Sequence, residues 1–472
     1  MSSFAALNGA FTSLTAQRIA LEVTSQNISN VNTPGYTRQR ADLAAIGGTA
    51  PTLFGGSDTR ATGVKVTSVE RLTDIFLESR LRTQTASSSR LTAIAESWSL
   101  LETTLAEPGE HGLAAGLDTF FNAWHDVANH PADGAAKAVL LGDAASLAAD
   151  INAGYRAAEE QWDATRTQVD ALAQDVNTTA AAVADLNLRI RDAVNAGESA
   201  NALMDERGLL LSDLAHLVGG EVRQRPDGTV DVLVGGSPLV EGGQANAVAV
   251  HGSPRMADLG GTPPATGWGT AEGDVRLVWA DSGQPSGATG GRLTGLLDVL
   301  APAEQGGPLA GLAQSYDTLA TTLAGEVNAL HSSLPGADGV HRDFFAFDAG
   351  RPALTLQVAL SDISQVTTGV AGEVDGSLAA RIAELSDART AWASTVVDLG
   401  VDTRTAVRRA GAAENARATA EAQLLSQTAV DLDEESVNLV MYQRAYEAAA
   451  RVLTTVDEML DTLINRTGVV GR

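Results

Sequence analysis

Two segments, one near each end of the chain, repeat apolar side chains every seven residues over the length of a whole helix. In residues 4–30 the stripe consists of Leu7, Leu14, Leu21 and Ile28, widened by Phe4 and Phe11. In residues 432–463 it consists of Leu432, Leu439, Tyr446, Leu453 and Leu460, with a second row of Tyr442, Ala449, Val456 and Leu463. Helices with such seams expose apolar surface when alone, so each needs a partner.

The simplest arrangement makes the two terminal helices partners in one coiled coil, because their lengths are similar. The rest of the chain would then lie between them in sequence and extend away from them in space. A glycine-rich segment with strand-like patterns, described below, would form the far end of the molecule. We therefore predict a mainly α, multi-domain fold with an inserted β domain. Its domains are a terminal coiled coil (1–36 and 430–472), a long-helix domain (37–218 and 290–429) and a small β-rich outer domain (219–289).

The N-terminal helix ends at a run of turn-forming residues. Pro34 followed by Gly35 fits the two central positions of a type II turn, where glycine supplies the positive φ. The asparagines Asn27, Asn30 and Asn32 fit helix capping and turn formation. They could equally hydrogen bond to neighbouring subunits of an assembly, and both roles can hold together.

Helical spacing recurs in the interior of the chain. It predicts helices from about 73 to 105, 156 to 196 and 202 to 218, and again across 309–330. Residues 36–71 look extended, and 340–377 irregular or β. At the start of the C-terminal helix, Asp431 with Glu434 three residues later predicts an N-terminal cap.

The composition changes between 219 and 291. This segment holds 17 of the 47 glycines and six of the 14 prolines, and it contains short alternating runs such as 229–234 and 275–279. These features predict short strands joined by tight turns.

Charge and composition exclude several classes of function. The net charge is −26 and only two basic residues are lysines, which argues against nucleic acid as a partner. Without cysteine, disulfides and thiolate chemistry are excluded. The N-terminus lacks the pattern of a cleaved secretory signal, and no apolar run is long enough for membrane insertion.

No enzyme motif stands out. His125 and His130 are five residues apart and so do not share a helix face as metal ligands would. The acidic pairs Glu159-Glu160 and Glu434-Glu435 lie on adjacent helical positions about 100° apart, and helix-start charge explains the second pair better than catalysis. We therefore predict no catalytic residue, no metal and no cofactor.

Two terminal motifs resemble those of known proteins. Residues 25–36 (SQNISNVNTPGY) and 437–452 (VNLVMYQRAYEAAARV) resemble the N- and C-terminal signatures of flagellar axial proteins, which include rod, hook and hook-associated proteins. Within that group, four internal segments resemble the hook-associated protein 1 family, whose members join hook to filament. These segments are 120–124, 201–207, 290–297 and 319–331.

The resemblance implies a structural subunit of the bacterial flagellum at the hook–filament junction, and no enzyme. It further implies terminal helices that are disordered in the monomer and pair on assembly. Expected partners are other copies of the chain, the flagellar hook protein, the second hook-associated protein and a cytosolic export chaperone on the C-terminal helix. The expected location is the extracellular flagellum, reached through type III export without a cleaved signal.

The assembly contacts expected on this basis lie in the two terminal segments. They are Leu7, Phe11, Leu14, Leu21, Asn27, Ile28, Asn30, Asn32, Pro34, Gly35, Tyr36, Leu439, Tyr442, Gln443, Tyr446, Leu453, Val456, Leu460 and Leu463. Another axial subunit, a rod or hook protein, is the alternative. A wall hydrolase on a helical scaffold is a more distant one, since no motif predicts it.

Overall fold

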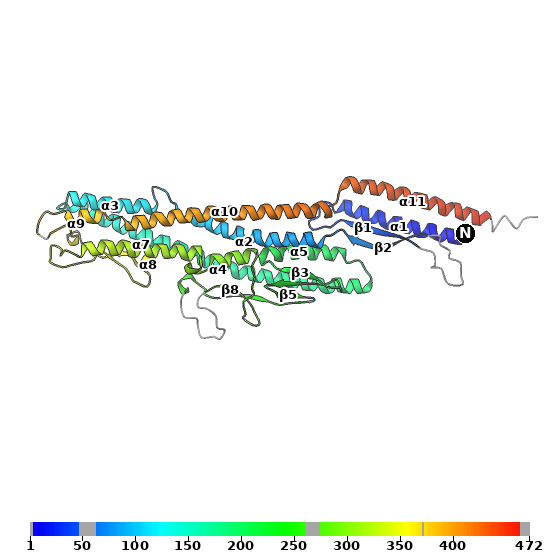
Figure 1. The fold of residues 1–472 in the computed structure, drawn as a ribbon, viewed down its shortest axis with the longest axis horizontal. Coiled ribbons are helices and arrows are strands. Elements are labelled where there is room, and N and C mark those ends of the chain that lie inside the picture. The colour runs from blue at the N-terminus through cyan, green and yellow to red at the C-terminus, as the bar shows by residue number, and fades with distance from the viewer. Residues whose placement is uncertain (1–2, 47–62, 260–273, 371, 463–472) are drawn as a thin grey trace, which may run out of the picture.

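The computed structural model describes residues 3–46, 63–259, 274–370 and 372–462, and the chain forms one elongated body (Figure 1). At one end lie α1 (Ser3–Ser29) and α11 (Leu432–Asp461). Along the rest run four long helices: α2 (Ile75–Leu105), α4 (Gly134–Ala196), α7 (Pro308–His331) and α10 (Asp387–Thr428). Small antiparallel sheets flank them, so the predicted mainly α fold with an inserted β region is confirmed.

The terminal helices lie side by side and antiparallel (Figure 1). A hairpin of β1 (Gln39–Ala45) and β2 (Val64–Arg71) packs on α1. A small apolar core, separate from that of the body, consists of Ala20, Val23 and Ala41, with Tyr442 of α11 packed against it. One end of the molecule is therefore a thin layer of two helices and a hairpin.

Helices α2 and α10 form a second antiparallel pair. Arg80 Nη1 donates to Gln423 Oε1 at 2.9 Å, and Ser88 Oγ donates to Glu414 at 2.8 Å. Farther along, Thr403 Oγ1 donates to the carbonyl of Trp98. As numbers rise along α2 they fall along α10, so this pair links the terminal helices to the distal end.

The main core lies among α3 (Leu113–Asn129), α4, α7 and α9 (Ser377–Ala383). At its distal end, Phe120 and Trp124 of α3 pack edge-on against each other, and both rings lie tilted against Phe344. Beside them lie β9 (Phe345–Ala346), the short α8 (Pro352–Thr355) and β10 (Gln357–Val358). The side chains of Phe120, Trp124 and Phe344 are all fully buried.

The β-rich segment lies along α4 (Figure 1). The prediction that it lies at the far end of the molecule is therefore wrong. It contains a four-stranded sheet and a two-stranded ribbon. Their strands are β3 (Glu221–Gln224), β4 (Val230–Val234), β5 (Ser237–Glu241), β6 (Gln244–Ala245), β7 (Val248–His251) and β8 (Arg276–Trp279). Its buried side chains, such as Val232 and Leu239, join the same core as the helices. The strands lie beside α4 because they cover its apolar face. Helices α5 (Asn201–Leu217) and α6 (Gly291–Val299) also pack against α4.

The helical predictions for α2, α5 and α7 match the structure closely, but α4 begins 22 residues earlier than predicted, at 134 instead of 156. Helices α3 and α10 were not predicted. Of the six buried residues of α10 only Trp392 and Leu399 are large and apolar, and both lie in its first half. The rest of its packing face consists of small residues, so no continuous apolar seam is visible in the sequence.

Candidate assembly interface

On α11, the predicted heptad seam faces α1. Leu439, Tyr442, Tyr446, Leu453 and Leu460 are half-buried, and Val456 is buried. Gln443 is exposed, and Leu463 lies outside the described residues. Only Glu435 and Val456 are buried among the 30 residues of this helix, so α1 covers α11 incompletely.

On α1, the structure corrects the predicted stripe. Leu7, Leu14, Leu21 and Ile28 are half-buried, but Phe11 is 59% exposed and does not lie in the contact. The deepest positions are smaller residues: Ala10, Ala16, Ala20, Val23, Thr24 and Asn27. Because α1 is wedged between α11 and the hairpin, small side chains allow the close approach that leucines would prevent.

A second apolar row runs along the outside of α11. Val437, Met441, Val452 and Met459 are between 50% and 68% exposed. Their spacings of 4, 11 and 7 residues place them on one helix face. This outer row was not predicted, although the residues were visible in the sequence, because the heptad rows indicate only the inner face. Within one chain it has no partner among the described residues.

The turn after α1 has the predicted form. The amide of Tyr36 donates to the carbonyl of Thr33 at 3.2 Å, and Gly35 has φ +76°. A Cβ on Gly35 would lie 2.6 Å from Cγ of Leu209 on α5, so the exposed Pro34–Gly35 turn also touches the body. Glycine is required here twice, by conformation and by space.

The three asparagines have different roles. Asn27 is 1% exposed: its Nδ2 donates to the carbonyl of Gln39, and its Oδ1 accepts from the Gln39 amide and from the Tyr36 hydroxyl. Asn30 accepts from the Thr33 hydroxyl within the turn. Asn32 is exposed and has no described hydrogen bond. Asn27 therefore ties α1 to β1, a role that neither prediction for it included.

Tyr36 lies at the centre of this joint. Its hydroxyl donates to Asn27 Oδ1 at 2.7 Å. Burial, together with the nearby carboxylates of Asp205 and Glu435, raises the pKa of Tyr36 to about 12. The hydroxyl therefore remains protonated and keeps donating at any physiological pH.

One face of α5 clamps the hairpin to the body. Asn201 Nδ2 donates to the Val69 carbonyl and to the Gln39 side chain, both at 3.0 Å. Asp205 accepts from Arg71 Nε at 2.8 Å. With Leu209 against Gly35, three α5 residues spaced four apart make the joint. The sequence contained part of this signal, since 201–207 is one of the segments on which the family resemblance rests.

Arg38 links the hairpin to the start of α11. Its guanidinium donates to Glu434 Oε2 at 2.6 Å and to Glu435 Oε1 at 2.7 Å, and its amide donates to the Thr428 carbonyl. Asp431 caps α11 by accepting from the amides of Asp433 and Glu434, which confirms the predicted cap. The acidic pair 434–435 thus holds an arginine, in agreement with its non-catalytic interpretation.

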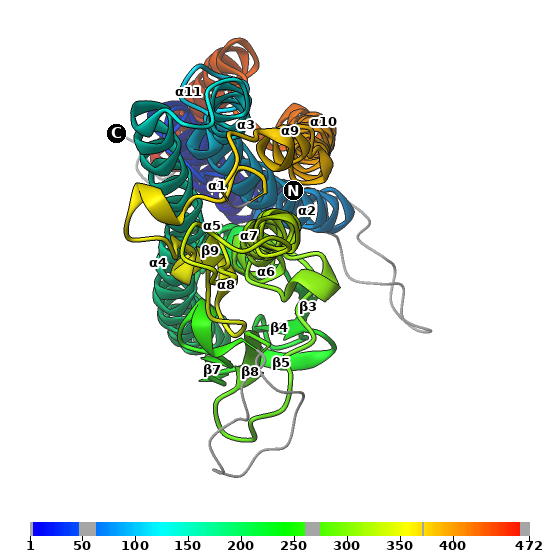
Figure 2. The same ribbon diagram turned by 90° about the vertical axis from the view of Figure 1, so that its left-hand side faces the viewer.

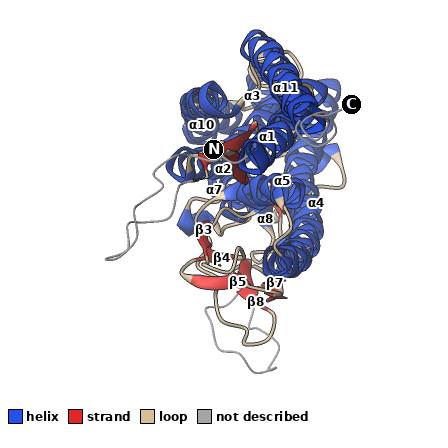
Figure 3. Cartoon of the chain, turned by 90° about the vertical axis from the view of Figure 1, so that its right-hand side faces the viewer, coloured by secondary structure: helices blue, strands red, loops and turns tan. Residues whose placement is uncertain are grey.

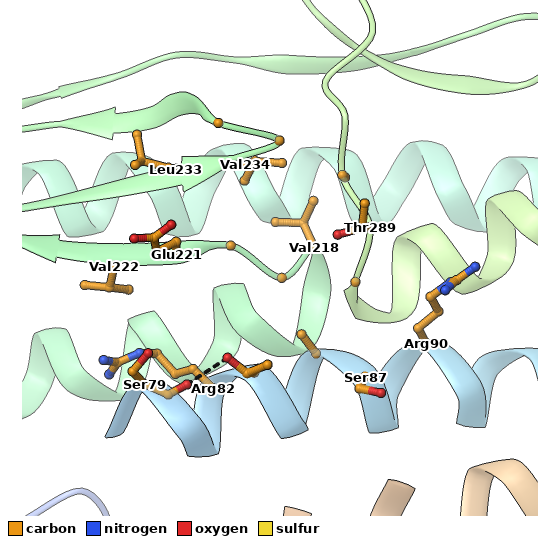
Figure 4. Close-up of a pocket in the computed structure, with 18 of the residues that line it drawn as sticks. Ser79, Arg82, Ser87, Arg90, Val218, Glu221, Val222, Leu233, Val234 and Thr289 are labelled. Carbon is orange, nitrogen blue, oxygen red and sulfur yellow. Dashed lines mark hydrogen bonds between the residues drawn. The ribbon is translucent and has the colours of Figure 1, made fainter. Parts of the chain in front are cut away.

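A groove of about 650 Å³ lies between α2 and the glycine turns at 219–220 and 235–236 (Figure 4). Of its charged side chains, Arg82 is paired with Glu78, and Arg90 with Asp298. In the described ranges, no three His, Asp or Glu side chains gather as metal ligands would. The described helices include none long and apolar enough to span a membrane.

The ends of the chain match family models of the flagellar basal body. Residues 7–37 match the model of the flagella basal body rod protein, and 421–466 match the model of the basal body rod FlgEFG protein C-terminal region. The two terminal helices and the turn after α1 therefore place the chain among flagellar proteins.

The interior narrows this class to one family. Residues 98–345, more than half of the chain, match the model of the flagellar hook-associated protein FlgK helical domain. The chain belongs to the FlgK family of flagellar hook-associated proteins.

Two named relatives align with the chain along nearly its whole length. Flagellar hook-associated protein 1 of Bacillus subtilis is 28% identical, with all of both chains aligned, and that of Escherichia coli is 26% identical over 97% of this chain and 99% of its own. The Salmonella typhimurium protein of the same name is 32% identical over 52% of this chain and 44% of its own. A solved structure of the hook junction protein FlgK from Burkholderia pseudomallei aligns at TM-score 0.47 and 25% identity, covering 57% of this chain and 47% of that one.

Proposed function

We infer that the chain is a structural subunit of the bacterial flagellum and forms the junction between hook and filament by helical assembly. The observation that carries this inference is a helical body of the FlgK family with both ends of the chain paired beside it. Relatives with the name hook-associated protein 1 align over the full length.

We propose that assembly completes the terminal helix pair. The outer row of α11 and the exposed Phe11 of α1 are apolar surfaces that a neighbouring copy would cover. On this proposal 1–36 and 430–472 form the inner domain, 37–218 and 290–429 the long-helix domain, and 219–289 an outer layer. The assembly residues proposed above lie in the inner domain.

We further propose the axial partners and the export route. Hook protein would contact one side of the ring of copies and the second hook-associated protein the other. The chain would leave the cell through the flagellar type III channel, with a chaperone on the exposed rows of α11 beforehand. An apolar helix face with little intramolecular cover supports such protection, because it would otherwise aggregate.

A deletion strain examined by electron microscopy tests the function. If the chain forms the junction, the deletion strain should have complete hooks without filaments. The wild-type gene should restore the filaments. Strains without hooks would instead support a rod or hook subunit.

We also propose that the protein has no enzymatic activity. The paired charges described above support this, since the acidic pair and both groove arginines are engaged in ion pairs. A peptidoglycan-containing gel would reveal a wall hydrolase, and clearing of the gel by the purified chain would overturn the proposal.

A further inference from the structure

Helix α10 is the long helix of the body with the least cover. Six of its 42 residues are buried, whereas 11 of the 24 residues of α7 are. Beyond its first turns α10 rests mainly on α2, at the edge of the molecule (Figures 1 and 2). Its outward side faces solvent along most of its length.

One row of that outward side is apolar and basic in an acidic protein, with the exposed Asp398 and Asp402 on its flank. Val397 and Val401 are 63% and 53% exposed, and Arg404 and Arg408 continue the same face at spacings of three and four residues. Arg409 lies beside them and is also exposed. Within the described part of the chain, none of these three arginines lies within ion-pairing distance of a carboxylate. In a chain of net charge −26, three unpaired arginines within six residues are a local exception.

An acidic pair lies on the opposite flank at the same height. Two hydrogen bonds locate the patches along the long axis. Thr403 of α10 donates to the Trp98 carbonyl of α2, and Trp162 of α4 donates from Nε1 to the carbonyl of Leu300, which follows α6 beside α2. Thr403 and Trp162 therefore lie at a similar position along the body. Next to Trp162, Glu159 is half-buried and Glu160 is exposed, and neither forms an ion pair among the described residues. Arg156, one turn earlier, pairs with neither of them.

These two surfaces cannot meet within one chain. Viewed along the long axis, α10 lies with α2 on one flank of the body and α4 lies on the other, and α7 contacts both α10 and α4 (Figures 2 and 3). Two different, complementary patches on opposite flanks are what a heterologous contact between identical subunits requires, and such contacts build rings and helical tubes. Opposite charge favours this pairing over contact of either patch with its own copy.

We propose that the α10 face of Val397, Val401, Arg404 and Arg408 docks on the Glu159–Glu160 face of α4 in a second copy. The inference rests on the proposed function, since it names a lateral contact of the assembled junction. It gives a role to an acidic pair that stands out in the sequence and that forms no ion pair among the described residues.

Charge reversal tests the contact whatever its exact register. The variants are Arg404→Glu/Arg408→Glu, Glu159→Lys/Glu160→Lys, and the combination of all four. Each pair of reversals should lower the fraction of cells with filaments by about tenfold, because like charges then face each other. The combined variant should recover, because each reversed face meets the other. If both reversals leave filaments unchanged, or if the combined variant is no better than either pair, the proposed contact is wrong.

A charge-matched control separates the contact from net charge. Arg223→Glu/Arg381→Glu makes the same change at exposed arginines that form no described ion pair, and should leave filaments at the wild-type level. Circular dichroism and the amount of chain exported to the medium verify folding and export. Failure of the wild-type gene to restore filaments would refute the proposed function itself, whereas neutral reversals beside a working wild type refute only this contact.

Cross-linking identifies the partner. The chain has no cysteine, so Arg408→Cys and Glu160→Cys in the same chain introduce the two thiols of interest alone. Oxidation of isolated flagella should give disulfide-linked multimers of this chain. Monomers alone, or a product of this chain with a different protein, would overturn the assignment of a second copy.

Discussion

The terminal helix pair and the helical body use the same secondary structure but bury it very differently. In α7, 11 of 24 residues are buried, including Leu309, Leu319 and Leu323, whereas in α11 only two of 30 are. The body also contains the aromatic cluster around Trp124, and the pair has a core of three small side chains. The body is therefore stable by its own packing, and the pair depends on what surrounds it.

The largest difference should appear on truncation of matched leucines. Leu323→Ala in α7, where the side chain is fully buried, should lower the free energy of unfolding by about 3 kcal/mol. Leu453→Ala in the half-buried seam of α11 should lower it by less than about 1 kcal/mol. Urea unfolding of the purified chain gives both values, and equal losses would remove the contrast between the regions.

The Arg38 clasp should have the next largest effect, confined to the pair. Glu435 is 2% exposed, so Arg38→Ala leaves a buried carboxylate without its arginine. Loss of one partner of such a pair costs about 3 kcal/mol, which α11 can escape by undocking. Amide exchange of 432–461 should rise at least tenfold while α7 is unchanged. Arg451→Ala, at an exposed arginine without an ion pair among the described residues, is the control and should exchange like wild type.

Two glycine substitutions should change the stability in opposite directions. Gly35→Ala places a Cβ at φ +76° against Leu209 and should destabilise the joint by about 1–2 kcal/mol. Gly325→Ala lies inside α7 with open space around it and should stabilise the body by up to about 1 kcal/mol. Thermal unfolding measures both, and stabilisation by Gly35→Ala would show that the turn does not press on α5.

The smallest effect concerns pH and one histidine of the body. His331 is fully buried: its Nδ1 lies 2.8 Å from the Arg342 carbonyl and its Nε2 accepts from the Thr367 amide. Burial lowers its pKa below the usual 6.5, partly opposed by that carbonyl and by Asp343. The unfolded chain then binds the proton more readily, so this contribution to stability is complete above about pH 6.5 and is lost as the pH falls below that.

The pH dependence can be assigned by comparison of variants. Between pH 7 and 5, His331→Gln should lose less stability than wild type, whereas His125→Gln, at an exposed histidine, should follow wild type. If the free energy of unfolding of wild type and of His331→Gln changes equally with pH, protonation of this side chain does not affect stability.

The sequence revealed the elements whose packing uses large side chains at regular spacing. The heptads of α11, the seam of α7 and the Pro34–Gly35 turn all have local signals, and the structure confirms them. It concealed α10, whose buried residues are mostly small. It also did not show that Phe11 is exposed in the single chain, because a stripe does not say which of its edges faces the partner helix.

Contacts between distant segments could not be predicted from one sequence. The joint brings Arg71 to Asp205 and Arg38 to Glu435, pairs separated by 134 and 397 residues. No periodicity specifies such pairs, because they depend on how the hairpin rests on α5 and α11. The β segment was recognised by its glycines and prolines, but its place along α4 follows from the apolar face of that helix.

The central claim is that the terminal pair is completed by neighbouring copies, and amide hydrogen exchange tests it most directly. In the purified chain, amides of 7–29 and 432–461 should exchange far faster than those of α4 and α7. In isolated flagella the same amides should become as protected as the body. Strong protection of both segments in the single chain, unchanged on assembly, would contradict the account.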